Sequence, residues 1–209
     1  MTDARESLVA TGKSMFERRL TFGSSGNISV KTGDGWLMSP TNVSLGALDP
    51  ARLSRLDASG KHVAGDAPTK ESFLHLAMYR ERASAGAVVH LHSTHSVAVS
   101  CLDGIDPEDV LPPITAYYVM RVGKLPLIPY FAPGDPTLGE AVGKVAARHS
   151  AVLLANHGPV VAGSSLDAAV NAIVELEETA RLYLMLRGRP SRYLTPEQVA
   201  DLKKRFPNP

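Results

Sequence analysis

The sequence predicts a layered α/β domain with a mixed or antiparallel central sheet. Short apolar runs indicate buried strands at 85–92, 125–130 and 151–155. Apolar residues at helical spacing predict helices at 3–20 and 165–187, the second being the longest. Strands and helices alternate irregularly, and the turns are too short for a regular series of parallel crossovers. These observations favour helices layered on a sheet that is not wholly parallel.

Turn and cap signals separate the elements of the N-terminal half. The turn FGSSGN leads into a strand, and a second strand at 36–38 stops at the segment SPTN. Pro68 and Thr69 provide the start and cap signals of a helix at 69–83. No repeat, low-complexity run or linker-like stretch interrupts the chain, so we expect one domain over residues 1–209.

Composition narrows the class of partner. The chain has 209 residues, which suits one compact domain with a sizeable core. Its net charge of +1 gives no bulk attraction to nucleic acids or anionic membranes, so neither partner is expected. A small anionic substrate needs only a local cluster of donors, and this class of ligand stays open.

The single cysteine, Cys101, has no intramolecular partner for a disulfide, which favours a reducing intracellular setting. The N-terminal segment is charged throughout and has no apolar stretch typical of a signal peptide. No run reaches the roughly 18 consecutive apolar residues that a membrane span needs. We therefore expect a cytoplasmic protein.

The histidines of the segment HLHSTH are the first candidates for chemistry. His90 and His92 are two residues apart at the end of a predicted strand, so their side chains share a face and can converge on one point. A catalytic zinc takes three protein ligands plus an open position, and it accepts histidine nitrogens readily. For an isolated pair of this kind, two hydrogen-bonded histidines at a strand end would be the more common explanation.

A third histidine favours the metal site over that explanation. His157 lies in LLANHGPVVAG, directly after a predicted strand and before a glycine that permits a tight turn. It completes a His₃ set with His90 and His92. His95 is the competing third ligand, but it is three residues from His92, and their side chains diverge if the strand continues.

Glu71 lies at the start of the helix predicted at 69–83. The helix dipole stabilises a carboxylate in the first turn, and this alone could explain its presence. The functional alternative is a fourth metal ligand or a general base, and the spacing does not separate the two. The remaining histidines are predicted to lie on the surface or on helix faces: His62, His75 and His149.

Three short segments have hydroxyls, backbone N–H groups or a cation near a turn or helix start, which is the equipment that phosphate needs. They are Ser24–Asn27, Thr41–Asn42 and Thr69–Lys70. Turns rich in Gly, Ser and Asn are usually structural, so each segment is weak evidence on its own. Lys70 beside Glu71 could equally be a solvated surface pair. Neither GxxxxGK[ST] nor GxGxxG is present, so nucleotide binding is not supported.

Taken in order, the segments GSSGNIS, SPTN, PTKE, VVHLHS and ANHGPVVAG resemble the class II aldolase/adducin family over about residues 5–190. The resemblance implies a three-layer αβα domain with a mostly antiparallel central sheet. It also implies Zn²⁺ bound by His90, His92 and His157, with Glu71 completing the resting metal site and acting as the acid/base.

The resemblance further implies a homo-oligomer, commonly a four-fold tetramer with sites at subunit interfaces. A tyrosine of the neighbouring subunit often assists in such sites, and Tyr117 or Tyr118 could fill this role. The family's phosphate-binding turns align with Gly26, Asn27, Thr41, Asn42, Thr69 and Lys70.

Two departures refine the expected activity. Sugar-phosphate aldolases of this family carry a small hydroxyl residue where this chain has Lys70, and often glycine where it has Asn42. PTKE together with SPTN most resembles the branch that decarboxylates 3-oxo-tetronate 4-phosphate. An extra cation at Lys70 suits a substrate that carries both carboxylate and phosphate.

The same site can perform this chemistry, because loss of CO₂ from a 3-oxo acid leaves an enediolate, whose two oxygens zinc can hold. Glu71 would then deliver a proton to the carbon, giving dihydroxyacetone phosphate. The alternatives are an aldolase of the fuculose, rhamnulose or ribulose phosphate type and a catalytically silent, adducin-like interaction domain. A 4-epimerase is disfavoured because those relatives carry aspartate at the position of Glu71.

Overall fold

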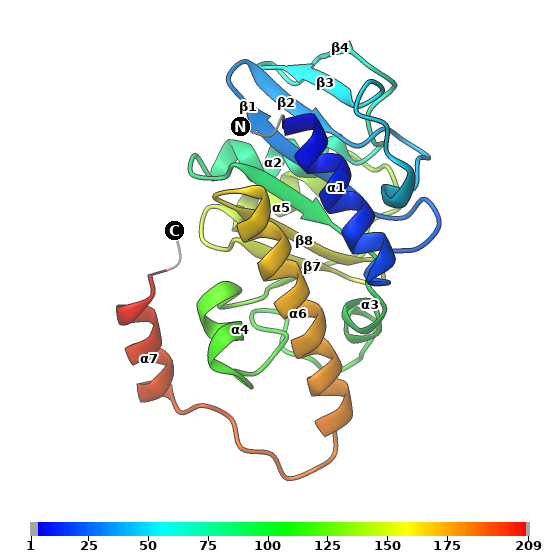
Figure 1. The fold of residues 1–209 in the computed structure, drawn as a ribbon. Coiled ribbons are helices and arrows are strands. Elements are labelled where there is room, and N and C mark those ends of the chain that lie inside the picture. Colours follow the sequence, from blue (N-terminus) through cyan, green and yellow to red (C-terminus); the bar gives the residue numbers. More distant parts are fainter. Residues whose placement is uncertain (1–3, 208–209) are drawn as a thin grey trace.

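The computed structural model describes residues 4–207, and over these residues an eight-stranded sheet lies between two layers of helices (Figure 1). The strand order is β4-β3-β2-β1-β5-β8-β7-β6. Neighbouring strands pair antiparallel except β6 and β7, which are parallel, so the expected mostly antiparallel sheet is confirmed. The strands are β1 (Asn27–Thr32), β2 (Gly35–Met38), β3 (Ser54–Asp57), β4 (His62–Ala64), β5 (Ala87–His90), β6 (Leu127–Ile128), β7 (Ala151–Leu154) and β8 (Gly158–Gly163).

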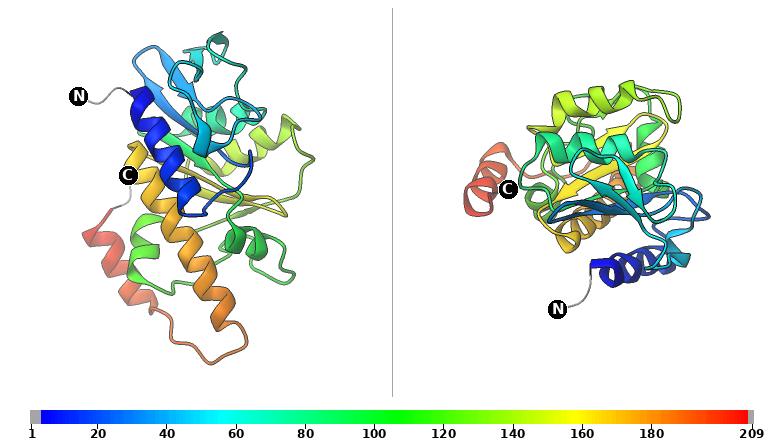
Figure 2. Two further views of the ribbon diagram at one scale, coloured as in Figure 1. Left: turned by 45° about the vertical axis from the view of Figure 1, so that its right-hand side comes forward. Right: turned by 90° about the horizontal axis from the view of Figure 1, so that it is seen from above.

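The helices divide between the two faces of the sheet (Figure 2). α1, α3 and α6 cover one face, whereas α2 and α5 pack against each other on the opposite face. α4 packs on α6, and α7 packs on α4. Their bounds are α1 (Ala4–Glu17), α2 (Ser72–Glu81), α3 (Thr94–Ser100), α4 (Ala116–Arg121), α5 (Thr137–Ala146), α6 (Leu166–Leu186) and α7 (Pro196–Arg205). None of these described helices is long and apolar enough to cross a membrane.

Side chains of β5 alternate between the two cores, as the pleat of a strand requires. Ala87 and Val89 join the core under α6, whereas Val88 joins the core under α2 and α5. By the same alternation His90, the last residue of β5, faces the α2 side of the sheet. The imidazole of His90 therefore lies near the start of α2.

Two predicted boundaries near the site are wrong. The helix predicted at 69–83 begins only at Ser72, and Glu71 is its N-cap residue, not a member of its first turn. The strand predicted at 85–92 ends at His90, because the chain leaves the sheet and enters α3 after the N-cap residue Ser93. His92 therefore lies in the connection between β5 and α3. The longest predicted helix, 165–187, is confirmed as α6, whose first turn is capped by the Ser165 hydroxyl.

Candidate active site

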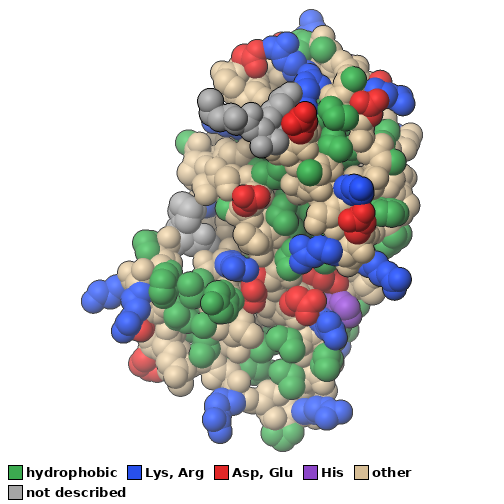
Figure 3. All heavy atoms as spheres, viewed as in Figure 1, with side chains coloured by type: hydrophobic (Ala, Val, Ile, Leu, Met, Phe, Trp, Pro, Cys, Tyr) green, Lys and Arg blue, Asp and Glu red, His purple; other side chains and the backbone are tan. Residues whose placement is uncertain are grey.

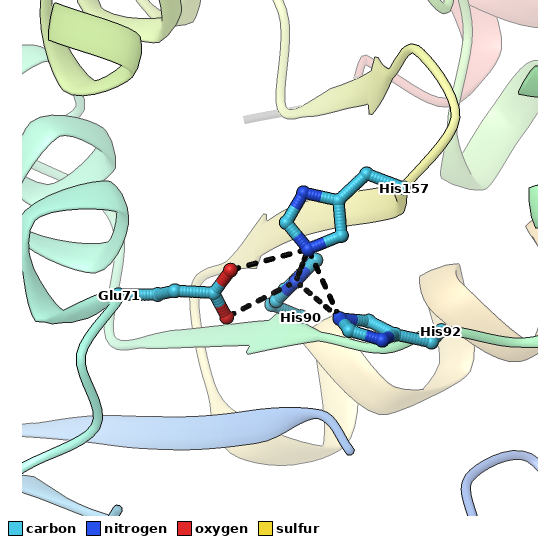
Figure 4. Close-up of side chains that lie close together, drawn as sticks. All are labelled: Glu71, His90, His92 and His157. Atoms are coloured by element: carbon cyan, nitrogen blue, oxygen red, sulfur yellow. Dashed lines mark hydrogen bonds and ion pairs between the residues drawn. The ribbon is translucent and has the colours of Figure 1, made fainter. Parts of the chain in front are cut away.

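Four side chains from three separate parts of the chain converge at one end of β5 (Figure 4). Glu71 comes from the start of α2, His90 from the end of β5, His92 from the connection that follows, and His157 from the turn between β7 and β8. One ligand atom from each of the four lies within 4.8 Å of the others. The structure thus brings together all three predicted metal ligands and the predicted acid/base.

The distances within this cluster are short. The Nε2 atom of His92 lies 3.1 Å from Nε2 of His90 and 3.1 Å from Nε2 of His157, and the latter two atoms are 3.3 Å apart. The carboxylate of Glu71 closes the group, with Oε2 3.4 Å from His90 Nε2 and Oε1 3.1 Å from His157 Nε2. Three imidazole nitrogens and a carboxylate therefore surround a single point.

The donor chemistry fits a divalent cation. His90 Nδ1 lies 2.8 Å from the carbonyl oxygen of Pro159, which can only accept, so Nδ1 carries the proton and Nε2 presents a bare lone pair to the cluster. Zinc–nitrogen bonds of about 2.0–2.1 Å place tetrahedral ligands about 3.3 Å apart, close to the observed Nε2 separations. His90, His92, His157 and Glu71 could therefore hold a metal ion.

Burial favours the neutral form of His90 and His92, which is the form that binds a metal. Complete burial lowers the pKa of His90 to about 4, although the nearby Glu71 carboxylate opposes the shift. Burial also lowers the pKa of His92, and repulsion from His157 adds to this. For Glu71, burial alone would raise the pKa, but the electrostatic interaction with His90 and the hydrogen bonds with His157 and Asn27 outweigh this effect. The pKa of Glu71 consequently lies well below its usual value.

The turn that carries His157 depends on backbone conformations that few residues adopt. Asn156 has φ 55°, and Gly158 has φ 152°. A Cβ atom at Gly158 would lie 2.3 Å from the carbonyl oxygen of Leu91, in the segment that leads to His92. Glycine at position 158 therefore permits the close approach of the two histidine-bearing segments, as expected for a tight turn beside His157.

A polar pocket of about 250 Å³ opens beside the cluster. Glu71 and His92 line it together with all six residues of the predicted phosphate-binding turns: Gly26, Asn27, Thr41, Asn42, Thr69 and Lys70. Two of its turns contain left-handed residues, Gly26 at φ 78° and Asn42 at φ 60°. The exposed Lys70 is the cation in this lining.

Asn27 makes a contact that was not predicted. Its amide Nδ2 donates to Glu71 Oε2 at 2.8 Å, and its Oδ1 lies 2.5 Å from His75 Nε2. The Asn27 side chain therefore links Glu71 to His75, and its role in phosphate binding stays a prediction. This bond could not be predicted from a local motif, because Asn27 and Glu71 are 44 residues apart.

Glu71 and His92 also line a second pocket, of about 500 Å³. Its walls include the aromatic residues Phe22, Tyr130 and Phe131. Sequence reasoning missed these residues, because apolar side chains in connections carry no motif. Glu71 thus lies where a polar pocket and a largely apolar pocket meet.

Several other predictions are settled by burial and contacts. His95 is not part of the cluster, because its Nδ1 pairs with Glu177 Oε1 at 2.8 Å. His75 lies on a helix face, one of its two predicted locations, and is completely buried on α2, where its ring contacts polar side chains of β1. Tyr118 is 1% exposed, so its predicted role in a neighbouring site is wrong, whereas Tyr117 is 58% exposed.

Comparison with known proteins agrees with this geometry. A model of the family described as class II aldolase and adducin N-terminal domain matches residues 6–184. The chain belongs to this family. A 3-oxo-tetronate 4-phosphate decarboxylase of Pectobacterium atrosepticum is 50% identical over 200 residues, which is 95% of this chain and 92% of that protein.

A more distant relative and a solved structure also match most of the chain. An L-fuculose phosphate aldolase of Escherichia coli is 32% identical over 203 residues, covering 95% of this chain and 92% of the relative. The crystal structure of YgbL from Escherichia coli matches with a TM-score of 0.93 at 48% identity, over 95% of this chain and 97% of that one.

Proposed function

We propose that this protein is a carbon–carbon lyase that decarboxylates 3-oxo-tetronate 4-phosphate to dihydroxyacetone phosphate and CO₂. The observation that carries the proposal is the contact between the Glu71–histidine cluster and a polar pocket that contains Lys70. Relatives with the corresponding name are about half identical over most of the chain: 50% in Pectobacterium atrosepticum and 49% in Haemophilus influenzae.

We assign zinc to the cluster, with His90, His92 and His157 as ligands and Glu71 completing the resting site. Three imidazoles and one carboxylate form a donor set that suits zinc better than it suits magnesium or calcium. Magnesium and calcium favour ligand sets made of oxygen atoms. When bound, zinc supplies positive charge that stabilises the negative charge developing on the substrate oxygens.

The residues around the cluster bind and orient the substrate. The turns at Gly26, Thr41–Asn42 and Thr69 offer hydroxyls and backbone N–H groups to the phosphate, and Lys70 adds a point charge. We infer that the phosphate binds in the polar pocket, which Glu71 also lines. The reacting carbon then lies near the carboxylate, which is the arrangement that proton transfer requires.

Glu71 moves the proton. Breaking the bond between the carboxylate carbon and C2 leaves its electron pair on C2 and the adjacent carbonyl, as an enediolate. The net reaction takes up one proton from solvent, and a Glu71 carboxyl oxygen passes it to C2. With 15% of its side chain exposed, Glu71 is in contact with solvent as well as with the pocket.

A substrate panel tests the proposal. Purified zinc-loaded protein is supplied separately with 3-oxo-tetronate 4-phosphate and with fuculose, rhamnulose and ribulose phosphates, and both CO₂ and aldehyde release are measured. We expect enzyme-dependent CO₂ release above the no-enzyme blank and little aldehyde. Aldehyde release without CO₂ would identify an aldolase, and silence in both assays would support an interaction domain.

We further propose that the protein acts in the cytoplasm as a homotetramer, with sites completed at subunit interfaces. Hydrophobic side chains gather around α4 and α7 on the face shown in Figure 3, where charged side chains of both signs are otherwise interspersed. Tyr117, on α4, is exposed and thus available to a neighbouring subunit. Light scattering would measure the mass of the assembly, and a monomeric, fully active enzyme would contradict this proposal.

A further inference from the structure

A row of buried polar side chains runs from Glu71 into the interface between β1 and α2. Asn27 and Ser29 are two residues apart on β1, and His75 and Tyr79 are four apart on α2, so each pair faces the other element. His75 Nδ1 lies 2.7 Å from Ser29 Oγ, which lies 2.9 Å from the Tyr79 hydroxyl. None of the four is more than 6% exposed, so water does not compete for these bonds.

The direction of every bond in this row follows from Glu71. An ionised carboxylate only accepts, so Asn27 must turn its N–H₂ group toward Glu71 and its oxygen toward His75. His75 Nε2 must then carry a proton that it donates to this oxygen. Burial lowers the pKa of His75 to about 3, so the ring is neutral and its Nδ1 is a bare acceptor.

The rest of the row supports this tautomer. The Ser29 hydroxyl donates to His75 Nδ1, and its oxygen accepts from the Tyr79 hydroxyl. A His75 ring with its proton on Nδ1 would present a lone pair to Asn27 instead. The amide would then turn over and direct its oxygen at the Glu71 carboxylate, where two acceptors would repel each other.

We propose that His75 is a positioning residue that holds the Asn27 amide in the orientation that fixes the Glu71 carboxylate. It touches neither substrate nor metal and acts only through Asn27. The inference rests on the proposed function for the role of Glu71 in turnover, but its effect on the geometry of the cluster is independent of the substrate.

Two substitutions at position 75 separate positioning from packing. In glutamine, the amide nitrogen is three bonds from Cβ, as Nε2 is in histidine, so His75→Gln keeps a donor toward Asn27. In asparagine, the amide is one bond shorter and matches Nδ1, so His75→Asn keeps the contact with Ser29 and loses the donor. Both variants are polar and neutral, which makes them a matched pair.

Zinc affinity and turnover are measured for both variants. Loss of a residue that orients a ligand typically costs 10–100-fold in metal affinity or activity. We expect His75→Asn to lose about 10–100-fold in zinc affinity, by competition with a chelator, and a similar factor in kcat, with KM within about twofold. His75→Gln is expected to stay within about threefold of wild type in each quantity.

Tyr79→Phe is the control for a general loss of stability. It removes one hydrogen bond from the same row but leaves the Ser29 hydroxyl free to donate to His75. We expect a lower melting temperature without a change in zinc affinity or kcat. A parallel fall of zinc affinity with melting temperature across all three variants would reduce His75 to a packing role and overturn the inference.

The wild-type protein provides a test that needs no variant. The ¹⁵N shifts of His75 at neutral pH should report a neutral ring with its proton on Nε2, and a proton on Nδ1 or a charged ring would overturn the inference. If wild type releases no CO₂, the proposed function fails, while the tautomer and the zinc comparison still decide the role of His75. If wild type is active and the two position-75 variants are equal, only this inference fails.

Discussion

The histidine cluster and the proposed phosphate-binding turns lie side by side but are held in place very differently. His90 is completely buried, and its second nitrogen is tied to the backbone of Pro159. Asn42 and Lys70, by contrast, are exposed residues in connections. The comparison indicates that the sheet and its close turns fix the reaction centre, whereas the connections adjust which substrate reaches it. Substitutions should therefore be nearly all-or-none in the cluster and graded in the turns.

The largest effect is expected for Glu71→Gln, because a general acid–base group typically contributes on the order of 10²–10⁴-fold to the rate. We expect kcat to fall by this factor while the protein remains folded. Glu81→Gln is the matched control, since Glu81 is an exposed carboxylate at the far end of the same helix. Steady-state kinetics with circular dichroism would measure both quantities. A Glu71→Gln rate above about a tenth of wild type would demote the residue to a structural role.

His157→Ala should remove most of the bound metal, because three ligands are the minimum that a catalytic zinc usually retains. We expect about one zinc per wild-type chain and far less in the variant, measured by elemental analysis. His95→Ala should keep its zinc, since His95 is paired with Glu177 outside the cluster. Full occupancy and activity in His157→Ala would show that the ligand set is wrong.

Lys70→Ser tests the exposed turns, where we expect graded effects. Loss of one charge-assisted contact should lower kcat/KM for CO₂ release by roughly one to two orders of magnitude, and zinc content should not change. Lys61→Ser is the control, because Lys61 is an exposed lysine away from the polar pocket. An unchanged kcat/KM in Lys70→Ser would remove the main residue-based reason for preferring a doubly anionic substrate.

An effect on stability, not on turnover, is expected from His75, which lies behind the cluster. Burial lowers the pKa of His75 from 6.5 to about 3, so the unfolded chain binds more protons between these values. The free energy of unfolding of metal-free protein should therefore fall as pH falls through this window, by up to about 1.4 kcal/mol per pH unit from this group. Denaturant titrations of wild type and His75→Gln should differ in this slope. Parallel curves would contradict the buried, neutral state of His75.

Much of the site was predictable because its signals are local in the sequence. His90 and His92 stand at the end of an apolar run, and His157 follows another apolar run and precedes a turn glycine. Both patterns indicate the end of a strand. Glu71 was placed correctly in the cluster by resemblance, although its position as an N-cap was not foreseen. The cap signals at Pro68 and Thr69 predicted a helix start at residue 69, whereas α2 begins at Ser72.

The rest depended on contacts between distant segments. α5 contains Gly139 and Gly143, which weaken a helical pattern, and the helix is completed by packing on α2, where Gly139 lies close to Phe73. β4 is exposed throughout and has no apolar periodicity to detect. The hydrogen-bond partner of His75 was not predicted, because periodicity gives the face of a helix but not the residue that it meets, here Ser29, 46 residues away.

At the start of α2, the residue that would best stabilise the helix differs from the residue that the proposed activity needs. N-cap positions favour Ser, Thr, Asp or Asn, and such a side chain typically stabilises a protein by about 0.5–2 kcal/mol. Glu71 occupies this position but makes no cap hydrogen bond, because its carboxylate is turned toward the histidines. Selection for heat resistance alone should therefore favour Glu71→Ser, a more stable variant that lacks the proposed proton carrier.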